Sequence, residues 1–189
     1  LMAWSEVLHE TYPDDELLPE MDKDISRLQL IAERFSKIGS APELKTQDVR
    51  PIITQVAGYY DRRTSSRVHI TVNIPEEPVE AKLNAPLFEW VIENLCKNAI
   101  DAMQGIGSLS LTVLPHATTH HGHNYLQIQI ADTGKGIAHT HFKTVFKPGF
   151  TTKKRGWGLG LSLAKRIVEE YHHARIYVLS SQIGCLLYT

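Results

Sequence analysis

The chain has 189 residues, which is enough for one full domain and a smaller appendage. Apolar residues make up 42% of it and charged residues 22%, as in globular proteins that bury a core. A formal net charge of -1 argues against nonspecific binding to nucleic acid or to an acidic membrane surface. Two cysteines are too few for a disulfide framework, so we expect a reducing compartment, the cytoplasm.

Residues 1–39 are typical of two helices joined by a turn. Between residues 17 and 38, apolar side chains recur every three or four positions, which predicts a long helix with one apolar stripe. A hairpin this small cannot cover both of its faces, so we favour a homodimer through the stripe over packing on the same chain. Residues 40–43 contain serine and proline and read as a linker.

The sequence shows no pattern of a membrane-spanning segment. No apolar run approaches the length that a bilayer requires. Because the chain begins within what reads as a helix, we expect a fragment. Any membrane contact would then come from segments upstream of Leu1.

Residues 44–189 alternate between helical and strand patterns. Asp48 and Asn84 are suited to cap helices that run to about Arg63 and Met103. Strands are predicted at 68–74, 109–114, 125–131, 175–180 and 184–188, with a further helix at 161–171. Hairpins mixed with helices predict an α+β fold, a two-layer α/β sandwich, rather than a doubly wound parallel sheet.

The predicted loop between the strands at 109–114 and 125–131 holds a group of histidines, which are His116, His120, His121 and His123. No cysteines or carboxylates accompany them at metal-ligand spacing. We therefore favour a solvated loop over a metal site.

The long helix that ends at Met103 has a polar face. Asn94, Asn98 and Asp101 are spaced i, i+4 and i+7, which places three oxygen-bearing side chains on one side. Asparagine is a poor interior helix former, and its amide oxygen suits a Mg²⁺ that also binds phosphates. The alternative is an ordinary solvated face. Cys96, between the asparagines, is interpreted as a packed thiol rather than a nucleophile.

A glycine-rich turn follows the strand at 125–131. Asp132 is placed to accept a hydrogen bond from the exocyclic amine of adenine. Gly134 and Gly136 allow a sharp turn and a close approach of the backbone to a base. A plain Asp-Gly turn is the alternative.

A second glycine-rich segment precedes the helix at 161–171. Gly156, Gly158 and Gly160 leave room for phosphate near backbone N–H groups, and residues 153–155 add positive charge. The strand that a dinucleotide fingerprint requires is missing before it. Residues 139–155 are too long for a simple connection, so we call them the lid. Its aromatic rings either cover a nucleotide or anchor the lid to the core.

Taken in order, these segments resemble the catalytic ATP-binding domain of bacterial sensor histidine kinases, within the superfamily that includes gyrase, heat-shock chaperone and mismatch-repair ATPases. Residues 94–101 match its asparagine box, 132–136 and 156–161 its two glycine boxes, and 146–152 the phenylalanine-containing part of its lid. The resemblance covers 44–189 and implies the Bergerat fold, whose sheet is mixed and mostly antiparallel with helices on one face. The preceding hairpin resembles the end of the kinase dimerisation and phosphoacceptor domain.

The resemblance implies ATP and Mg²⁺ as ligands. Asn98 and Asn94 would hold Mg²⁺, and Asp132 would recognise adenine. The full set of implied nucleotide contacts is Asn94, Lys97, Asn98, Asp101, Asp132, Gly134, Lys135, Gly136, Ile137, Phe150, Thr151, Thr152, Lys153, Gly156, Gly158, Leu159, Gly160 and Leu161.

The resemblance also implies two-component signal transduction. The γ-phosphoryl group of ATP would pass to a histidine and then to an aspartate of a response regulator receiver domain. In the hydrolysing branches a glutamate that activates water stands where this chain has Asn94, which favours phosphotransfer. His9 matches the phosphoacceptor motif only weakly, so we expect the acceptor upstream of Leu1 and no autophosphorylation by this fragment. The alternatives are an ATP-hydrolysing relative and a nucleotide-sensing or dimerisation module without turnover.

Overall fold

The computed structural model describes residues 18, 42–120, 123–153, 156–179 and 185–188. The chain divides into two compact units, Leu1–Pro42 and Glu43–Thr189. Apart from Leu18, which is helical and buried, the predicted hairpin of residues 1–39 lies outside the described residues, and so does His9. The predicted dimer contact stays a prediction. Each helix in the described part of the chain is too short or too polar to cross a membrane.

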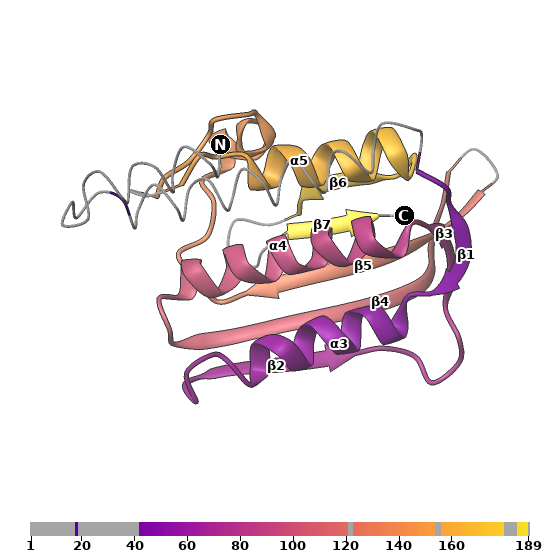
Figure 1. Ribbon diagram of the computed structural model, residues 1–189, viewed down its shortest axis with the longest axis horizontal. Helices are drawn as coiled ribbons and strands as arrows, with labels where there is room; N and C mark the ends of the chain where they lie inside the picture. Colours follow the sequence, from indigo (N-terminus) through magenta and orange to yellow (C-terminus); the bar gives the residue numbers. More distant parts are fainter. Residues whose placement is uncertain (1–17, 19–41, 121–122, 154–155, 180–184, 189) are drawn as a thin grey trace. The chain divides into compact units, whose positions relative to one another are not determined.

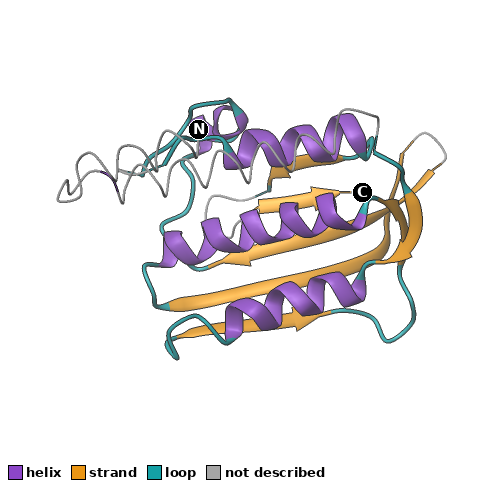
Figure 2. Cartoon of the chain, viewed as in Figure 1, coloured by secondary structure: helices purple, strands orange, loops and turns teal. Residues whose placement is uncertain are grey.

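A five-stranded sheet forms the base of the second unit, with helices on one of its faces (Figures 1 and 2). The strand order is β2-β4-β5-β7-β6, and only the β2–β4 pair is parallel. The strands are β2 Val68–Asn73, β4 Gly107–His120, β5 His123–Asp132, β6 Arg175–Val178 and β7 Cys185–Tyr188. A mixed, mostly antiparallel sheet under one layer of helices confirms the predicted two-layer α+β sandwich.

The β4–β5 hairpin is longer than the sequence predicted. The pairing continues beyond a shift in register to Thr118 opposite Tyr125 and His120 opposite His123. The segment assigned to a polar loop is therefore mostly strand. Thr118 and Thr119 favour extended backbone because they are β-branched, and this preference outweighs the polar composition.

Three helices cover the sheet, and they begin close to where the sequence predicted. They are α3 Arg50–Asp61, α4 Ala85–Met103 and α5 Gly160–Arg166, which continues as the π-helical turn η3 Ile167–Tyr171. Asn84 caps α4, because its side chain accepts a hydrogen bond from Leu87 N at 3.2 Å. The predicted cap of α3 is displaced by one residue: Val49 is at the N-cap position and makes no side-chain cap, while Oδ1 of the preceding Asp48 accepts from Arg50 N at 3.1 Å.

The core lies between the helices and the sheet. Leu87, Val91 and Leu95 form a buried stripe on α4, as their four-residue spacing predicted. They share the core with Ile53 of α3 and with the fully buried Leu109, Leu111 and Ile128 of the sheet. Since one side of α4 is committed to this core, its polar side is left for other contacts.

A small second sheet was missed by the sequence analysis. β1 Lys45–Asp48 pairs antiparallel with β3 Glu80–Leu83. Both strands are four residues long and half of their residues are charged. β1 shows no alternation, and β3 alternates charged and apolar residues only over the shortest length that can indicate a strand. The Arg50 guanidinium beside Asp48 holds the pKa of that carboxyl at about 2, well below its usual range. This ion pair ties the end of β1 to the start of α3.

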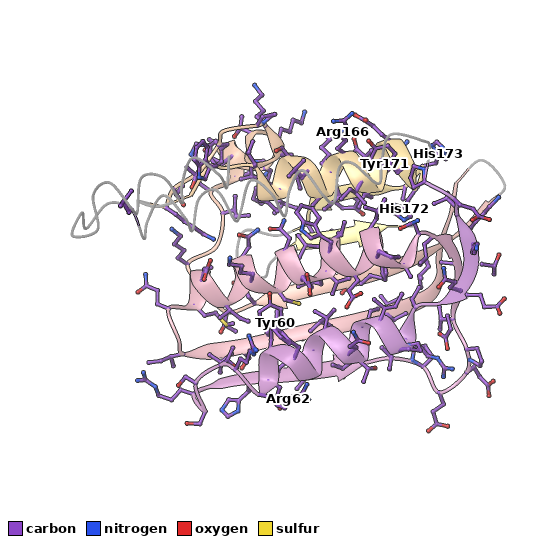
Figure 3. All side chains as sticks on the ribbon, in the orientation of Figure 1. Tyr60, Arg62, Arg166, Tyr171, His172 and His173 are labelled. Atoms are coloured by element: carbon purple, nitrogen blue, oxygen red, sulfur yellow. The ribbon has the colours of Figure 1, made fainter. Side chains whose placement is uncertain are left out.

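His172, labelled in Figure 3, follows η3 and links it to the start of α4 by hydrogen bonds. Its Nε2 accepts a hydrogen bond from Asn84 N at 3.1 Å, and its Nδ1 lies 2.9 Å from Ile167 O. The neutral ring with a proton on Nδ1 satisfies both contacts. Burial lowers the pKa of His172, which favours that neutral form.

Candidate functional site

The polar face of α4 meets the lid at one lysine. Lys153 Nζ lies 3.0 Å from Asn98 Oδ1 and 2.7 Å from Asp101 Oδ2. The side chains of Lys153 and Asp101 are 41% and 42% exposed, and such an ion pair stabilises by about 0.2–1 kcal/mol. The structure therefore brings together two segments that the sequence analysis singled out separately.

The two acceptors of Lys153 also test whether a metal ion fits here. An amide oxygen and a carboxylate oxygen already share one cationic group. Hard oxygen donors of these two kinds are the ligands that Mg²⁺ prefers. The donor set of Asn98 and Asp101 thus suits a divalent cation.

Asn94 faces the second glycine segment instead of Lys153. A Cβ placed on Gly160 would lie 2.5 Å from Asn94 Oδ1, so only glycine fits against this carboxamide. Asn94 Nδ2 is buried and has no hydrogen-bond partner among the described residues. Because an unpaired buried amide costs about 1–3 kcal/mol, this donor is ready for a ligand oxygen or a water molecule.

The first glycine turn is fixed to α4. Asp132 Oδ1 accepts a hydrogen bond from Gly134 N at 2.8 Å. A Cβ on Gly134 would lie 2.7 Å from the carbonyl carbon of Ala102, and Lys135 N donates to Ala102 O at 3.3 Å. The close approach that requires glycine is therefore an approach to α4. Gly136 follows with a left-handed backbone, at φ +70°.

The carboxyl group of Asp132 is half-buried. Burial raises its pKa, and the hydrogen bond from Gly134 N opposes that rise. An acceptor at the end of β5, next to a turn held against α4, has a fixed position. Such an acceptor is suited to select one hydrogen-bonding edge of a base.

The first half of the lid is anchored in the core. It contains the 3-10 turns η1 His139–His141 and η2 Thr144–Phe146. Val145 and Phe146 are buried, so Phe146 is a ring that anchors the lid to the core. Phe150 is half-buried, and its ring centroid lies 5.2 Å from that of His141.

Residues 149–153, which we call the second half of the lid, are held by polar contacts and by glycines. Lys135 Nζ donates to Thr152 Oγ1 at 3.2 Å, and Gly149 N donates to Gly158 O at 3.1 Å. Gly158 has φ +62°, and a Cβ there would lie 2.5 Å from the carbonyl carbon of Gly149. Trp157 beside it is 61% exposed. The glycines after the lid thus allow it to pack closely on the segment that enters α5.

The other predicted contacts border the same region. Thr151 Oγ1 accepts from Lys153 N at 3.1 Å, and Leu159 O accepts from Leu163 N at 2.9 Å where α5 begins. Ile137 and Leu161 lie in the segments that flank the lid, and Gly156 lies just after it. Lys97 is exposed on α4 and lines a cavity together with Asp101. Lys154 and Arg155 lie outside the described residues.

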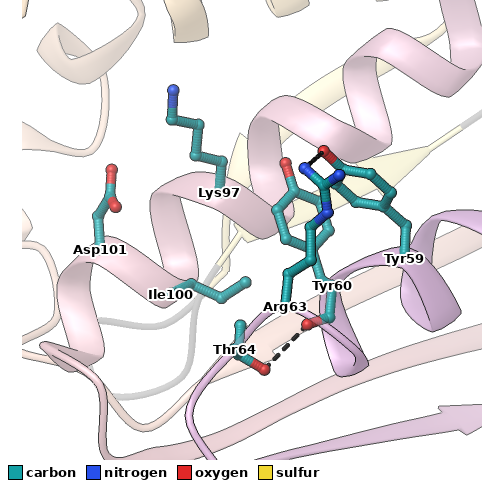
Figure 4. Close-up of a pocket in the computed structure, with 7 residues that line it drawn as sticks. All are labelled: Tyr59, Tyr60, Arg63, Thr64, Lys97, Ile100 and Asp101. Atoms are coloured by element: carbon teal, nitrogen blue, oxygen red, sulfur yellow. Dashed lines mark hydrogen bonds between the residues drawn. The ribbon is translucent and has the colours of Figure 1, made fainter.

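A cavity of about 360 Å³ lies between α3 and α4 (Figure 4). It is lined by Tyr59, Tyr60, Arg63, Thr64, Lys97, Ile100 and Asp101. Arg63 stacks on Tyr59 with its Cζ 4.4 Å from the ring centroid. Tyr60 Oη donates to Glu93 O at 3.2 Å, and burial raises the pKa of Tyr60 to about 12. The sequence analysis missed the residues of α3 and of the turn after it, because no motif marks them.

The sequence is similar to a known family of ATPases and to named sensor kinases. A family described as histidine kinase-, DNA gyrase B- and HSP90-like ATPase matches residues 84–186, more than half of the chain. The sensor histidine kinase ZraS of Escherichia coli is 28% identical over 170 residues, which are 88% of this chain and 35% of ZraS. The chain spans about a third of the length of the ZraS relatives that it matches.

Two solved structures of the histidine kinase ThkA share the fold. Its catalytic domain has a TM-score of 0.68 at 21% identity and covers 77% of this chain and 96% of that domain. ThkA in complex with the response regulator protein TrrA has a TM-score of 0.69 at 17% identity, covering 99% of this chain and 56% of ThkA. The chain therefore belongs to the histidine kinase-, DNA gyrase B- and HSP90-like ATPase family, with an ATP-binding domain of the sensor histidine kinase type.

Proposed function

We propose that this chain is the catalytic part of a sensor histidine protein kinase, and that it transfers the γ-phosphoryl group of ATP to a histidine. The observation that carries the proposal is Asn94, whose carboxamide packs against Gly160 beside the lid. A carboxamide does not accept a proton at neutral pH, so it cannot generate hydroxide from water. Phosphoryl transfer to a histidine ring needs no such base, because the ring nitrogen is itself the nucleophile.

In this proposal each segment of the site has one task. Asn98 and Asn94 hold Mg²⁺ and the phosphates, and Asp132 accepts a hydrogen bond from the amine of adenine. Mg²⁺, when bound, neutralises the charge that phosphoryl transfer redistributes over the phosphate oxygens. Lys135 and Lys153 bring cationic groups to the same region, and the anchored first half of the lid fixes where they can reach. Catalysis is then mainly positioning and charge neutralisation.

The partners follow from the same proposal. The acceptor histidine belongs to a helical hairpin that forms a homodimer, and the phosphoryl group passes on to an aspartate of a response regulator. The name of the relative ZraS and the complex of ThkA with TrrA support this pathway. A cytoplasmic location suits a protein that consumes ATP and carries two cysteines.

Phosphotransfer to a hairpin supplied as a separate protein tests the proposal. The hairpin is taken from a homologous sensor kinase and carries the acceptor histidine. With ATP labelled at the γ-phosphate, we expect no label on this chain alone and acid-labile label on the hairpin. Replacing the acceptor histidine by glutamine, or Asn98→Ala in this chain, should remove the signal.

Two outcomes would contradict the proposal in different ways. Release of inorganic phosphate without labelled hairpin would indicate a hydrolysing ATPase. Nucleotide binding with neither transfer nor hydrolysis would indicate a nucleotide-sensing module.

A further inference from the structure

We propose that the Lys153 ammonium and a divalent cation are alternative occupants of one position on α4, made by Asn98 and Asp101. Metal binding then displaces Lys153 and releases the second half of the lid from α4. This inference rests on the proposed function, since it assumes that metal-bound ATP occupies the site. It adds Asp101 to the metal donors and gives the lid an attachment that the metal controls.

The first step of the argument is geometric. One ammonium nitrogen contacts Asn98 Oδ1 at 3.0 Å and Asp101 Oδ2 at 2.7 Å. Two oxygens that reach the same nitrogen are close enough to share a metal ion or its bound water. Asn98 and Asp101 lie three positions apart on α4, so the helix backbone sets the spacing of the two oxygen donors. Asn94, by contrast, points its carboxamide at Gly160.

The second step is electrostatic. The Asp101 carboxylate attracts both the Lys153 ammonium and a divalent cation, and the divalent cation has twice the charge. They cannot occupy the position together, because like charges at contact distance repel. Exposed ion pairs like Lys153–Asp101 change an equilibrium by about fivefold or less, so the metal can displace the lysine.

The third step concerns what the lid loses. Val145 and Phe146 keep the first half of the lid in the core whether or not Lys153 is bound to α4. Residues 151–153 are exposed, and their described polar contacts outside the lid run through Lys153 and through Thr152 to Lys135. Gly149, where the two halves meet, has a left-handed backbone, and the space that a side chain would occupy there is open, although its N–H donates to Gly158 O. Displacement of Lys153 therefore loosens a short segment without unfolding the domain.

Binding of Mn²⁺ alone, without nucleotide, tests the exchange. Mn²⁺ binds the same oxygen ligands as Mg²⁺ and its free concentration is measurable by electron paramagnetic resonance. We expect Lys153→Met to bind Mn²⁺ about twofold to fivefold more tightly than the wild type, because the competing ammonium is gone. The matched control is Lys135→Met, which removes the same charge near the lid but donates to Thr152 instead. It should change the affinity by less than half as much.

Hydrogen exchange of the lid gives a second readout. In the wild type, Mn²⁺ should speed amide exchange in residues 149–153 to the rate found for Lys153→Met, and it should have no further effect on that variant. Asp101→Asn should weaken Mn²⁺ binding both in the wild type and when combined with Lys153→Met. Equal Mn²⁺ affinities for Lys153→Met and Lys135→Met, or no Mn²⁺ binding by either, would overturn the inference.

Titration of a nonhydrolysable ATP analogue with Mg²⁺ into the wild type separates the two proposals. If the wild type binds the analogue and the two lysine variants have equal Mn²⁺ affinities, the exchange fails and the proposed function stands. Loss of analogue binding by the wild type means that the proposed function fails, whatever the Mn²⁺ affinities are.

Discussion

Replacing Gly158 by alanine should damage the site through one added methyl group. Gly158 has φ +62°, and the added Cβ would lie 2.5 Å from the carbonyl carbon of Gly149 and 2.6 Å from Phe150 O. Both contacts are backbone atoms, so no side-chain rotation relieves them. Gly149 provides a matched control, because its φ is +82° and no described atom lies within 4 Å of its added Cβ.

The magnitude follows from two separate effects. An alanine in the left-handed region costs about 1–2 kcal/mol relative to glycine, and this applies to both positions. At Gly158 the steric overlap adds about 1–3 kcal/mol, the usual cost of an extra methyl group in a packed site. Gly158→Ala should therefore cost about 1–3 kcal/mol more than Gly149→Ala.

Two assays on the same variants measure that difference. The lid can move away from the added methyl group, so part of the cost will appear as weaker nucleotide binding, at about tenfold per 1.4 kcal/mol. Urea unfolding and titration with a nonhydrolysable ATP analogue should together show the larger loss for Gly158→Ala. Equal losses for both variants in both assays would refute the packing argument.

Three further predictions concern other parts of the domain. His173 has φ +53°, so His173→Gly should relieve left-handed strain and raise the free energy of unfolding by about 1 kcal/mol; a lower urea midpoint would count against it. Burial lowers the pKa of His172, so the unfolded chain binds a proton there more readily, and stability should fall as the pH drops below about 6.5 towards the folded pKa. His172→Phe should flatten that part of the curve, and an unchanged difference between wild type and variant from pH 7.5 to 5.5 would exclude the effect. Asp132→Ala should weaken binding of the ATP analogue by about 1–3 kcal/mol and leave GTP analogue binding unchanged, since it removes a half-buried acceptor for the adenine amine; equal losses for both nucleotides would contradict that role.

The parts of the fold that the sequence predicted are those with local signals. α4 has a capping asparagine at Asn84, a proline in its first turn and apolar residues at helical spacing, and it runs from Ala85 to Met103 as expected. β1 and β3 have no comparably strong signal, because each is only four residues long and half charged, and the two strands pair only with each other. Tertiary pairing, and not local preference, decides such short strands.

The candidate site divides in the same way. The asparagine face and the glycine segments are visible as spacing along the chain. The contact of Lys153 with Asp101 joins residues 52 positions apart, and no local pattern indicates it. The close backbone approach that Gly134 allows was predicted toward a base, and the structure adds that a Cβ there would meet Ala102 of α4. Sequence spacing thus indicates candidate segments of the site, and only the fold shows which of their atoms meet.

Calorimetric titration tests the central claim, which is that the asparagine face of α4 holds metal-bound ATP. A nonhydrolysable ATP analogue would be titrated with and without Mg²⁺ into the wild type and into Asn98→Ala, with circular dichroism to verify that the variant is folded. The account predicts binding that requires Mg²⁺ and weakens by at least about tenfold in Asn98→Ala. Binding that is equally tight without Mg²⁺ and in the variant would contradict it.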